Sequence, residues 1–311
     1  MGKWYRLAVF LLCLPATVVA QSGSGMRFVY PPPESATDQR HTYYWELLEA
    51  ALKSNRDKYG DFQLAAYPVA MTFPRAVSEV ESGAGRVNIV ARATNLDLES
   101  RMLPVPLPLD KGLLGYRLFL IMPPTQAQLD KVRTLDDLRQ FSIGQASTWT
   151  DVKILGGNDF KVVIGENYEG LFQMLGARRF DLFSRGVNEI ASEWQTHRDL
   201  VPGISIEKNF VVQYPLPRYF FVPRTPEGQA MAERITDGLK RLVASGEFER
   251  RYLAYKRLVL ADVPLAGRKI FRLANSQLSS LAPPLNDKRW WDDLAPELSG
   301  SSNSAQRSGE K

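Results

Sequence analysis

Hydrophobic and polar positions follow two periods along this chain, and the two periods predict strands and helices in turn. Short apolar runs at residues 26–30, 62–67 and 87–91 predict buried strands. Between them, apolar positions recur at three-and-four spacing over residues 44–52, after cap groups at residues 35–38, which predicts a helix. Residues 73–81 predict a second one. Strands that alternate with helices favour an α/β fold built on parallel sheets.

A second alternating series follows a proline-rich stretch. Pro104, Pro106 and Pro108 exclude a central strand or a helix there, because each ring removes a backbone donor. Beyond it the pattern predicts strands at residues 116–122, 141–144, 160–164, 180–183 and 218–222, helices at residues 134–139, 148–155, 168–175 and 187–194, and two long closing helices. Two series in 311 residues match the two domains that this length suggests.

Residues 1–20 have the pattern of a cleaved export signal. A basic start precedes an apolar run at residues 7–14, and the small residues Val18 and Ala20 stand before the expected cleavage site at Gln21. The apolar run is too short to span a bilayer. We therefore expect a periplasmic protein, and from residue 299 to residue 311 a disordered tail of serine, glycine and charged residues.

The composition excludes several kinds of chemistry. The formal charge of +5 is spread along the chain, which is unlike the basic stripe of a nucleic-acid-binding protein. Cys13 is the single cysteine and lies in the signal, so the mature chain has no thiol for a disulfide or a metal site. His41 and His197 are the only histidines, so we expect neither a metal nor a cofactor.

Four motifs follow one another in a fixed order. They are Gly85-Arg86-Val87-Asn88-Ile89 with Thr94 and Glu99-Ser100-Arg101, Thr134-Leu135-Asp136-Asp137-Leu138 with Ile143-Gly144-Gln145, Leu171-Phe172-Gln173-Met174-Leu175 with Arg179-Phe180-Asp181-Leu182-Phe183, and Gly246-Glu247-Phe248. In this order they resemble motifs of the type II periplasmic solute-binding proteins of family 3, the polar amino-acid receptors of ABC importers. The resemblance covers residues 26–258.

The resemblance implies a two-lobed α/β fold with a hinged cleft between the lobes. Two crossing segments, near residues 114–118 and 214–220, would join the lobes. Lobe 1 would then consist of residues 21–115 and 220–298, with the C-terminal extension included, and lobe 2 of residues 116–219. Closure of the lobes on a ligand is the expected motion.

The resemblance also implies a carboxylate clamp in the first motif. Arg101 stands at the position of the family's clamping arginine, with Arg92 as the second choice, and Thr94 would add a hydroxyl from the same loop. The alternative for Arg101 is a surface charge paired with Glu99 or Asp97.

Three further residues are candidates for the cleft. Ser147 and Thr148 stand at the start of a predicted helix, where free backbone donors favour an anion. An ordinary helix cap is the alternative there. Tyr30 ends the first strand and could face either the cleft or the core.

Arg185 marks a departure from the family. Amino-acid receptors of the family place an ammonium-binding aspartate about five residues after the position of Asp181, and Arg185 stands close to that place. An alignment slip would put Asn188 or Glu189 there instead. Two arginines facing one cleft, Arg101 and Arg185, would favour a ligand with more than one acidic group.

We therefore expect a monomeric periplasmic solute-binding protein that captures a small anionic or amino-acid-like ligand for an ABC permease or a membrane sensor. It is expected not to be an enzyme and not to bind nucleic acid. Two alternatives stay open. One is a dehydratase-like enzyme on the same scaffold, with Glu166 or Glu189 as the cleft carboxylate. The other is a degenerate interaction protein, to which the extension at residues 260–298 would belong.

Overall fold

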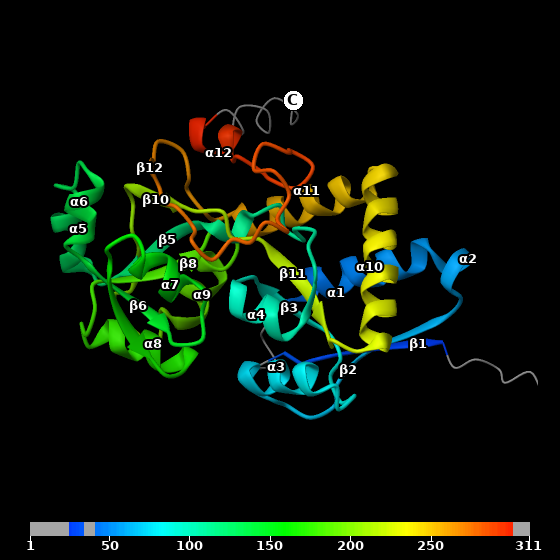
Figure 1. Cartoon of the computed structure of the whole chain (residues 1–311). Coiled ribbons are helices and arrows are strands. Elements are labelled where there is room, and N and C mark those ends of the chain that lie inside the picture. Colours follow the sequence, from blue (N-terminus) through cyan, green and yellow to red (C-terminus); the bar gives the residue numbers. More distant parts are fainter. Residues whose placement is uncertain (1–24, 34–40, 301–311) are drawn as a thin grey trace, which may run out of the picture.

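Two halves with separate sheets make up the chain in the computed structural model, which describes residues 25–33 and 41–300 (Figure 1). The predicted signal peptide and residues 301–311 of the predicted tail lie outside these residues. The predicted tail begins at Ser299, but that residue ends the helix α12 (Ala295–Ser299). Within the described part, no helix is both long enough and apolar enough to cross a membrane.

Lobe 1 is the right-hand half in Figure 1 and holds two small sheets. One is a parallel pair, β1–β2, and the other is antiparallel in the order β3-β11-β4. Its elements are β1 (Met26–Tyr30), α1 (Thr42–Ser54), α2 (Arg56–Tyr59), β2 (Phe62–Ala66), α3 (Phe73–Ser82), β3 (Val90–Ala93), α4 (Leu96–Arg101), β4 (Leu103–Val105), β11 (Arg218–Val222) and α10 (Pro226–Ala244).

The helices of lobe 1 pack as their apolar spacing predicts. The inward-facing positions of α1 and α10, among them Leu48 and Leu239, are fully buried in one core. The two helices approach closely at Gly238, where a Cβ atom would lie 2.2 Å from the carbonyl oxygen of Ala51. Gly238 therefore sets how near the helices can come.

Lobe 2 is built on a single seven-stranded sheet in the order β12-β10-β5-β8-β6-β7, with β9 also paired to β5. Its elements are the 3₁₀ turn η1 (Leu113–Gly115), β5 (Tyr116–Ile121), α5 (Pro123–Leu129), α6 (Leu135–Arg139), β6 (Ser142–Ala146), α7 (Asp151–Gly156), β7 (Lys161–Gly165), α8 (Tyr168–Gly176), β8 (Leu182–Gly186), α9 (Ile190–His197), β9 (Ser205–Ile206) and β10 (Phe210–Gln213).

The prediction of parallel sheets is right for only part of the fold. Strands β6, β7 and β8 are parallel to one another, but β5 is antiparallel to β8, β9 and β10. The reason is the path of the chain, since β5 carries it into lobe 2 and β10 carries it out again. Strand β11 is antiparallel to both neighbours in lobe 1 for a similar reason.

The two segments that connect the lobes lie side by side. The backbone N–H of Tyr214 donates to the carbonyl oxygen of Gly115 at 3.1 Å. A Cβ atom on Gly115 would lie 2.1 Å from the carbonyl oxygen of Tyr214, so a side chain has no space there. The expected crossings near residues 114–118 and 214–220 therefore meet at one point of contact.

Helix α11 (Glu247–Leu260) and the residues after it belong to both lobes. Strand β12 (Lys269–Arg272) pairs with β10 in the lobe 2 sheet, whereas Trp290 packs in the core of lobe 1. We call residues 263–299, which end in α12 (Ala295–Ser299), the C-terminal strap. The prediction that this extension belongs to lobe 1 is wrong for β12, because the free edge of β10 accepts it as a further strand.

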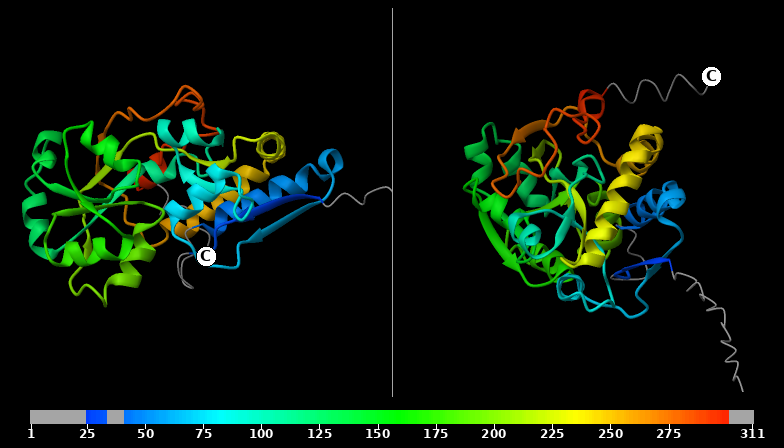
Figure 2. Two further views of the ribbon diagram at one scale, coloured as in Figure 1. Left: turned by 60° about the horizontal axis from the view of Figure 1, so that its bottom comes forward. Right: turned by 45° about the vertical axis from the view of Figure 1, so that its right-hand side comes forward.

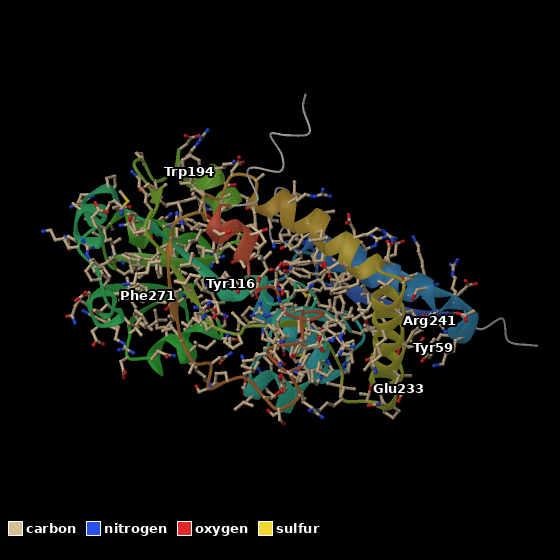
Figure 3. All side chains as sticks on the ribbon, turned by 90° about the horizontal axis from the view of Figure 1, so that it is seen from above. Tyr59, Tyr116, Trp194, Glu233, Arg241 and Phe271 are labelled. Atoms are coloured by element: carbon tan, nitrogen blue, oxygen red, sulfur yellow. The ribbon has the colours of Figure 1, made fainter. Side chains whose placement is uncertain are left out.

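The C-terminal strap contacts both crossing segments. Asn275 Nδ2 donates to the carbonyl oxygen of Pro215 at 2.7 Å, and Tyr116 Oη donates to the carbonyl oxygen of Asp292 at 3.0 Å. The orange segment in Figure 2 shows this path over the junction of the two halves. Seen from above, Tyr116 lies between the halves, with Phe271 on the lobe 2 side and Arg241 at the far end of lobe 1 (Figure 3).

Candidate functional site

A pocket of about 1070 Å³ lies between the lobes. Lobe 1 contributes residues of α1 and of the turn before α3, lobe 2 contributes residues of α8 and α9, and α11 closes the pocket from a third side. Its volume is that of a small-molecule site. The described residues that line it include four carboxylates, namely Glu46, Glu169, Glu193 and Asp262.

The basic side chains of this pocket already have partners. Arg251 donates from Nε to Glu247 at 2.7 Å, and His197 Nε2 lies 3.0 Å from the carboxylate of Glu169. Among the described residues, Glu46 has no ion-pair partner. Acidic side chains therefore outnumber basic ones in the lining.

Stacked aromatic rings form one wall of the pocket. The rings of Tyr43 and Tyr255 are 4.1 Å apart and almost parallel. Tyr43 donates to the carbonyl oxygen of Leu109, and Tyr255 accepts a hydrogen bond of 2.8 Å from Asn188 Nδ2. These bonds join α1, α11 and lobe 2, so the wall is fixed by three separate parts of the fold.

A buried carboxylate lies behind this wall. Asp110 is fully buried and accepts a hydrogen bond of 3.0 Å from Tyr44 Oη. Burial raises the pKa of Asp110 to about 6, although the nearby Arg218 opposes the change. Burial also raises the pKa of Tyr255 to about 12, and Asp110 acts in the same direction. The group behind the wall therefore titrates close to neutral pH, while the tyrosine stays protonated.

Arg185 is held inside lobe 2 by two carboxylates. Its Nε and Nη2 each lie 2.5 Å from one oxygen of Glu193, and Nη2 lies 3.0 Å from Glu189. The guanidinium also lies over the rings of Trp149, Tyr168 and Phe183, at 4.7, 5.6 and 5.1 Å from their centroids. Burial opposes the charge, but Glu193 and Glu189 raise the pKa of Arg185 above its ordinary value.

These contacts show that the side chain of Arg185 is paired, and a role for it toward a ligand stays a prediction. The side chain of Arg185 is 3% exposed and compensated within its own lobe. Arg185 lies in strand β8, whereas Glu189 is the N-cap residue of α9 and Glu193 lies one turn further along that helix. The four-residue spacing of the two carboxylates places them on one helix face, which the sequence could have indicated.

Arg101 lies elsewhere and has partners of its own. It ends α4, and its guanidinium pairs with Glu81 and Asp97, each at 2.9 Å. The pairing with Asp97 is the surface alternative considered for this residue. Arg101 and Arg185 are therefore not two unpaired cations in one cleft. Their charges are compensated by acidic side chains, so they do not favour a di-anionic ligand. A clamping role for Arg101 stays a prediction.

The other predicted residues lie outside the lining of this pocket. Thr94 is buried, and its Oγ1 donates to Glu99 at 2.5 Å. Ser147 and Thr148 are exposed in the turn after β6, and α7 begins at Asp151 rather than at residue 148. Tyr30 stacks on Trp45 at 4.4 Å. Their roles toward a ligand stay predictions.

The lobes contact each other where these loops meet. Asn95 Nδ2 of lobe 1 donates to Thr150 Oγ1 of lobe 2, and Arg218 lies 3.7 Å from Glu189. Residue types alone gave no signal for these pairs, since each joins segments far apart in sequence. Within the described residues no group of three or more His, Cys, Asp or Glu side chains could hold a metal ion.

Solved structures share this fold. An arginine transport-system periplasmic binding protein of Legionella pneumophila is 14% identical, with a TM-score of 0.53, over 75% of this chain and 100% of its own. An arginine-specific periplasmic binding protein of Salmonella typhimurium is 13% identical, with a TM-score of 0.52, over 75% of this chain and 99% of its own.

A third solved structure is an ancestral amino-acid-binding protein described as a precursor of cyclohexadienyl dehydratase. It is 12% identical, with a TM-score of 0.51, over 74% of this chain and 95% of its own. No protein-family model and no curated protein matches the sequence. The likeness confirms the predicted fold, which is the two-lobed α/β fold of family 3 type II solute-binding proteins. Because these structures match almost completely to three-quarters of this chain, part of the chain lies beyond the shared fold.

Proposed function

We propose that this chain is a periplasmic solute-binding protein that captures a small, amino-acid-like solute with a cationic group. The observation that carries the proposal is the pocket of about 1070 Å³ between the lobes, with Glu46, Glu169 and Asp262 in its lining. Carboxylates beside aromatic faces favour ammonium and guanidinium groups. The likeness to periplasmic amino-acid-binding proteins supports a binding role rather than an enzymatic one.

A thermal-shift screen of the mature chain tests the proposal. The screen compares L-lysine, L-arginine and agmatine with glutamate, succinate and glycerol phosphate. A solute at one hundred times its dissociation constant stabilises a protein by about 2.7 kcal/mol, which raises the melting temperature measurably. We expect stabilisation by the cationic solutes. Stabilisation by the di-anions alone would restore the earlier expectation of an anionic ligand.

A pair of variants on one helix tests the role of the acidic lining. Glu46→Gln removes a pocket carboxylate, and calorimetry should show affinity for the cationic solute weakened by about twofold to fivefold, as is typical of an exposed ion pair. Glu49→Gln is the matched control, because Glu49 lies on α1 too and pairs with Lys53. Equal affinities in both variants would contradict the assignment of Glu46.

Arg101→Ala tests the predicted clamp in the same titration. A clamp with two charge-assisted hydrogen bonds would make the loss tenfold or more. We expect less than twofold, since Glu81 and Asp97 already bind this guanidinium. We also propose that the protein delivers its solute to an ABC permease or presents it to a membrane sensor. A neighbouring gene that encodes a permease or a sensor would distinguish the two roles.

A further inference from the structure

The guanidinium of Arg185 occupies a closed site beside the pocket, which shares Tyr168 and Glu193 with it. We propose that the side chains around it form a guanidinium-binding site that the chain fills with its own arginine. The filled site prevents guanidinium and ammonium groups of solutes from pairing with Glu193. This inference goes beyond the proposed function and stands on the geometry of the site alone.

The charges of the site match one guanidinium group. Glu193 receives Nε and Nη2 of Arg185 on its two oxygens, both at 2.5 Å, which is the bidentate geometry of an arginine–carboxylate pair. Glu189 adds a second carboxylate at 3.0 Å. Since the side chains of Arg185 and Glu193 are both 3% exposed, water screens this pairing little.

Aromatic faces complete the enclosure. The guanidinium carbon lies 4.7 Å from the ring centroid of Trp149, and the rings of Tyr168 and Phe183 lie within 6 Å. Cation–π attraction acts over such distances and is strongest for a desolvated cation. Arg185 is therefore bound through the same two kinds of contact that would hold a guanidinium group from solution.

The walls of the site are held independently of Arg185. Trp149 stacks on Phe183 with parallel planes, and Tyr168 Oη donates to Glu193 at 3.0 Å. Tyr168 also packs edge-on against Phe172. These contacts connect the turn after β6, the start of α8, strand β8 and helix α9, so removal of the arginine side chain should leave a preformed cavity.

Two members of the enclosure also face the inter-lobe pocket. Tyr168 and Glu193 line that pocket, whereas Arg185 does not. Both oxygens of Glu193 already accept hydrogen bonds from inside the enclosure. The charge of Glu193 is therefore already compensated when a solute enters the pocket. Arg185 thus prevents a cationic group of the solute from pairing with Glu193.

The test is chemical rescue of Arg185→Ala in the full mature chain. The buried carboxylate of Glu193 loses its counter-charge, while Glu189 keeps Arg218 at 3.7 Å, so the melting temperature should fall by roughly 5–15 °C. Addition of 10 mM methylguanidinium should recover at least half of that loss, with saturation. Methylammonium, which lacks the planar fork, and N-methylurea, which lacks the charge, should recover less than a quarter of it.

Two control variants make the result specific. Arg241→Ala removes an arginine that also pairs with two carboxylates, Asp57 and Asp237, but on the surface at 37% exposure, and methylguanidinium should not rescue it. Glu193→Gln combined with Arg185→Ala should abolish the rescue. If Arg185→Ala is unfolded at 20 °C, the folded fraction by circular dichroism becomes the readout.

Rescue of Arg185→Ala by methylguanidinium alone supports the proposal. No rescue, equal rescue by methylammonium, or equal rescue of Arg241→Ala overturns it. The assay needs no solute bound in the pocket, so a failure of the proposed function leaves its outcome readable.

Discussion

Asn95 of lobe 1 donates a hydrogen bond from Nδ2 to Oγ1 of Thr150 in lobe 2, at 2.9 Å. Both side chains are buried, and Asn95 also caps α4 by accepting from the backbone N–H of Leu98. The bond therefore connects a helix start in one lobe to the turn before α7 in the other. It is thus a direct side-chain contact between the two lobes.

Removal of this acceptor should weaken the contact between the lobes. Thr150→Val has nearly the same shape but leaves the buried Asn95 amide without its partner, which costs about 1–3 kcal/mol. Urea unfolding should show this loss in the free energy of unfolding. Thr148→Val is the control, because Thr148 is exposed in the same turn. A loss equal in both variants would show that the cross-lobe bond contributes nothing.

The contact between the crossing segments predicts a contrast between two glycines. Gly115→Ala places a Cβ atom 2.1 Å from the backbone of Tyr214, so it should destabilise the protein by about 3 kcal/mol or more. Gly156→Ala meets no atom within 4 Å at the end of α7 and should be neutral or slightly stabilising. Thermal unfolding of both variants checks the contrast, and equal melting temperatures would contradict it.

Asp110 predicts a pH dependence with a definite sign. Burial raises its pKa from 3.8 to about 6, so between these values the folded chain binds a proton that the unfolded chain has released. Stability should therefore fall as pH rises from about 4 to about 6, and the full cost, up to about 3 kcal/mol, is present above that range. Unfolding by urea at half-unit steps of pH measures it.

Asp110→Asn should remove this slope, because the amide does not titrate. Asp57→Asn should keep it, since Asp57 is exposed and the hydrogen bond from Arg241 lowers its pKa. An unchanged slope in Asp110→Asn would assign the effect to another group.

The C-terminal strap predicts a loss of stability far from the cleft. Trp290 is buried in the core of lobe 1, where its ring lies 5.5 Å from that of Phe248. Trp290→Ala should cost about 3–5 kcal/mol and increase amide hydrogen exchange over residues 273–289. Leu285→Ala, which is exposed in the same segment, should change neither quantity by comparison. Unchanged exchange in Trp290→Ala would show that the strap is held elsewhere.

The pattern of apolar residues predicted most helices and strands, but not which strands pair with one another. The apolar spacing located α1 and α10, whose apolar residues face a core on one side only. It also located the returning strand β11, whose five residues are all buried. It did not predict the direction of β5 or the pairing of β12, since these depend on which sheet edge a distant segment reaches.

The same limit applied to the candidate site. The resemblance pointed to Thr94, residues 147–149 and Arg185, none of which lines the pocket, and it did not show that Arg101 pairs with Glu81 and Asp97. Helix α11 also contributes Tyr255 to the pocket lining, but this residue belongs to none of the sequence motifs. Charges in the sequence were visible, but their pairing was not.

In each lobe, a strand from late in the chain completes a sheet. Strand β11 stands between β3 and β4 and supplies hydrogen bonds to both, while β12 adds an edge to the lobe 2 sheet from residues 269–272. During synthesis, residues 90–105 therefore leave the ribosome more than a hundred residues before their pairing strand. A nascent chain without that strand exposes unsatisfied backbone edges. Synthesis through β11 must therefore precede completion of this sheet, and a fragment that stops at residue 213 should aggregate rather than fold.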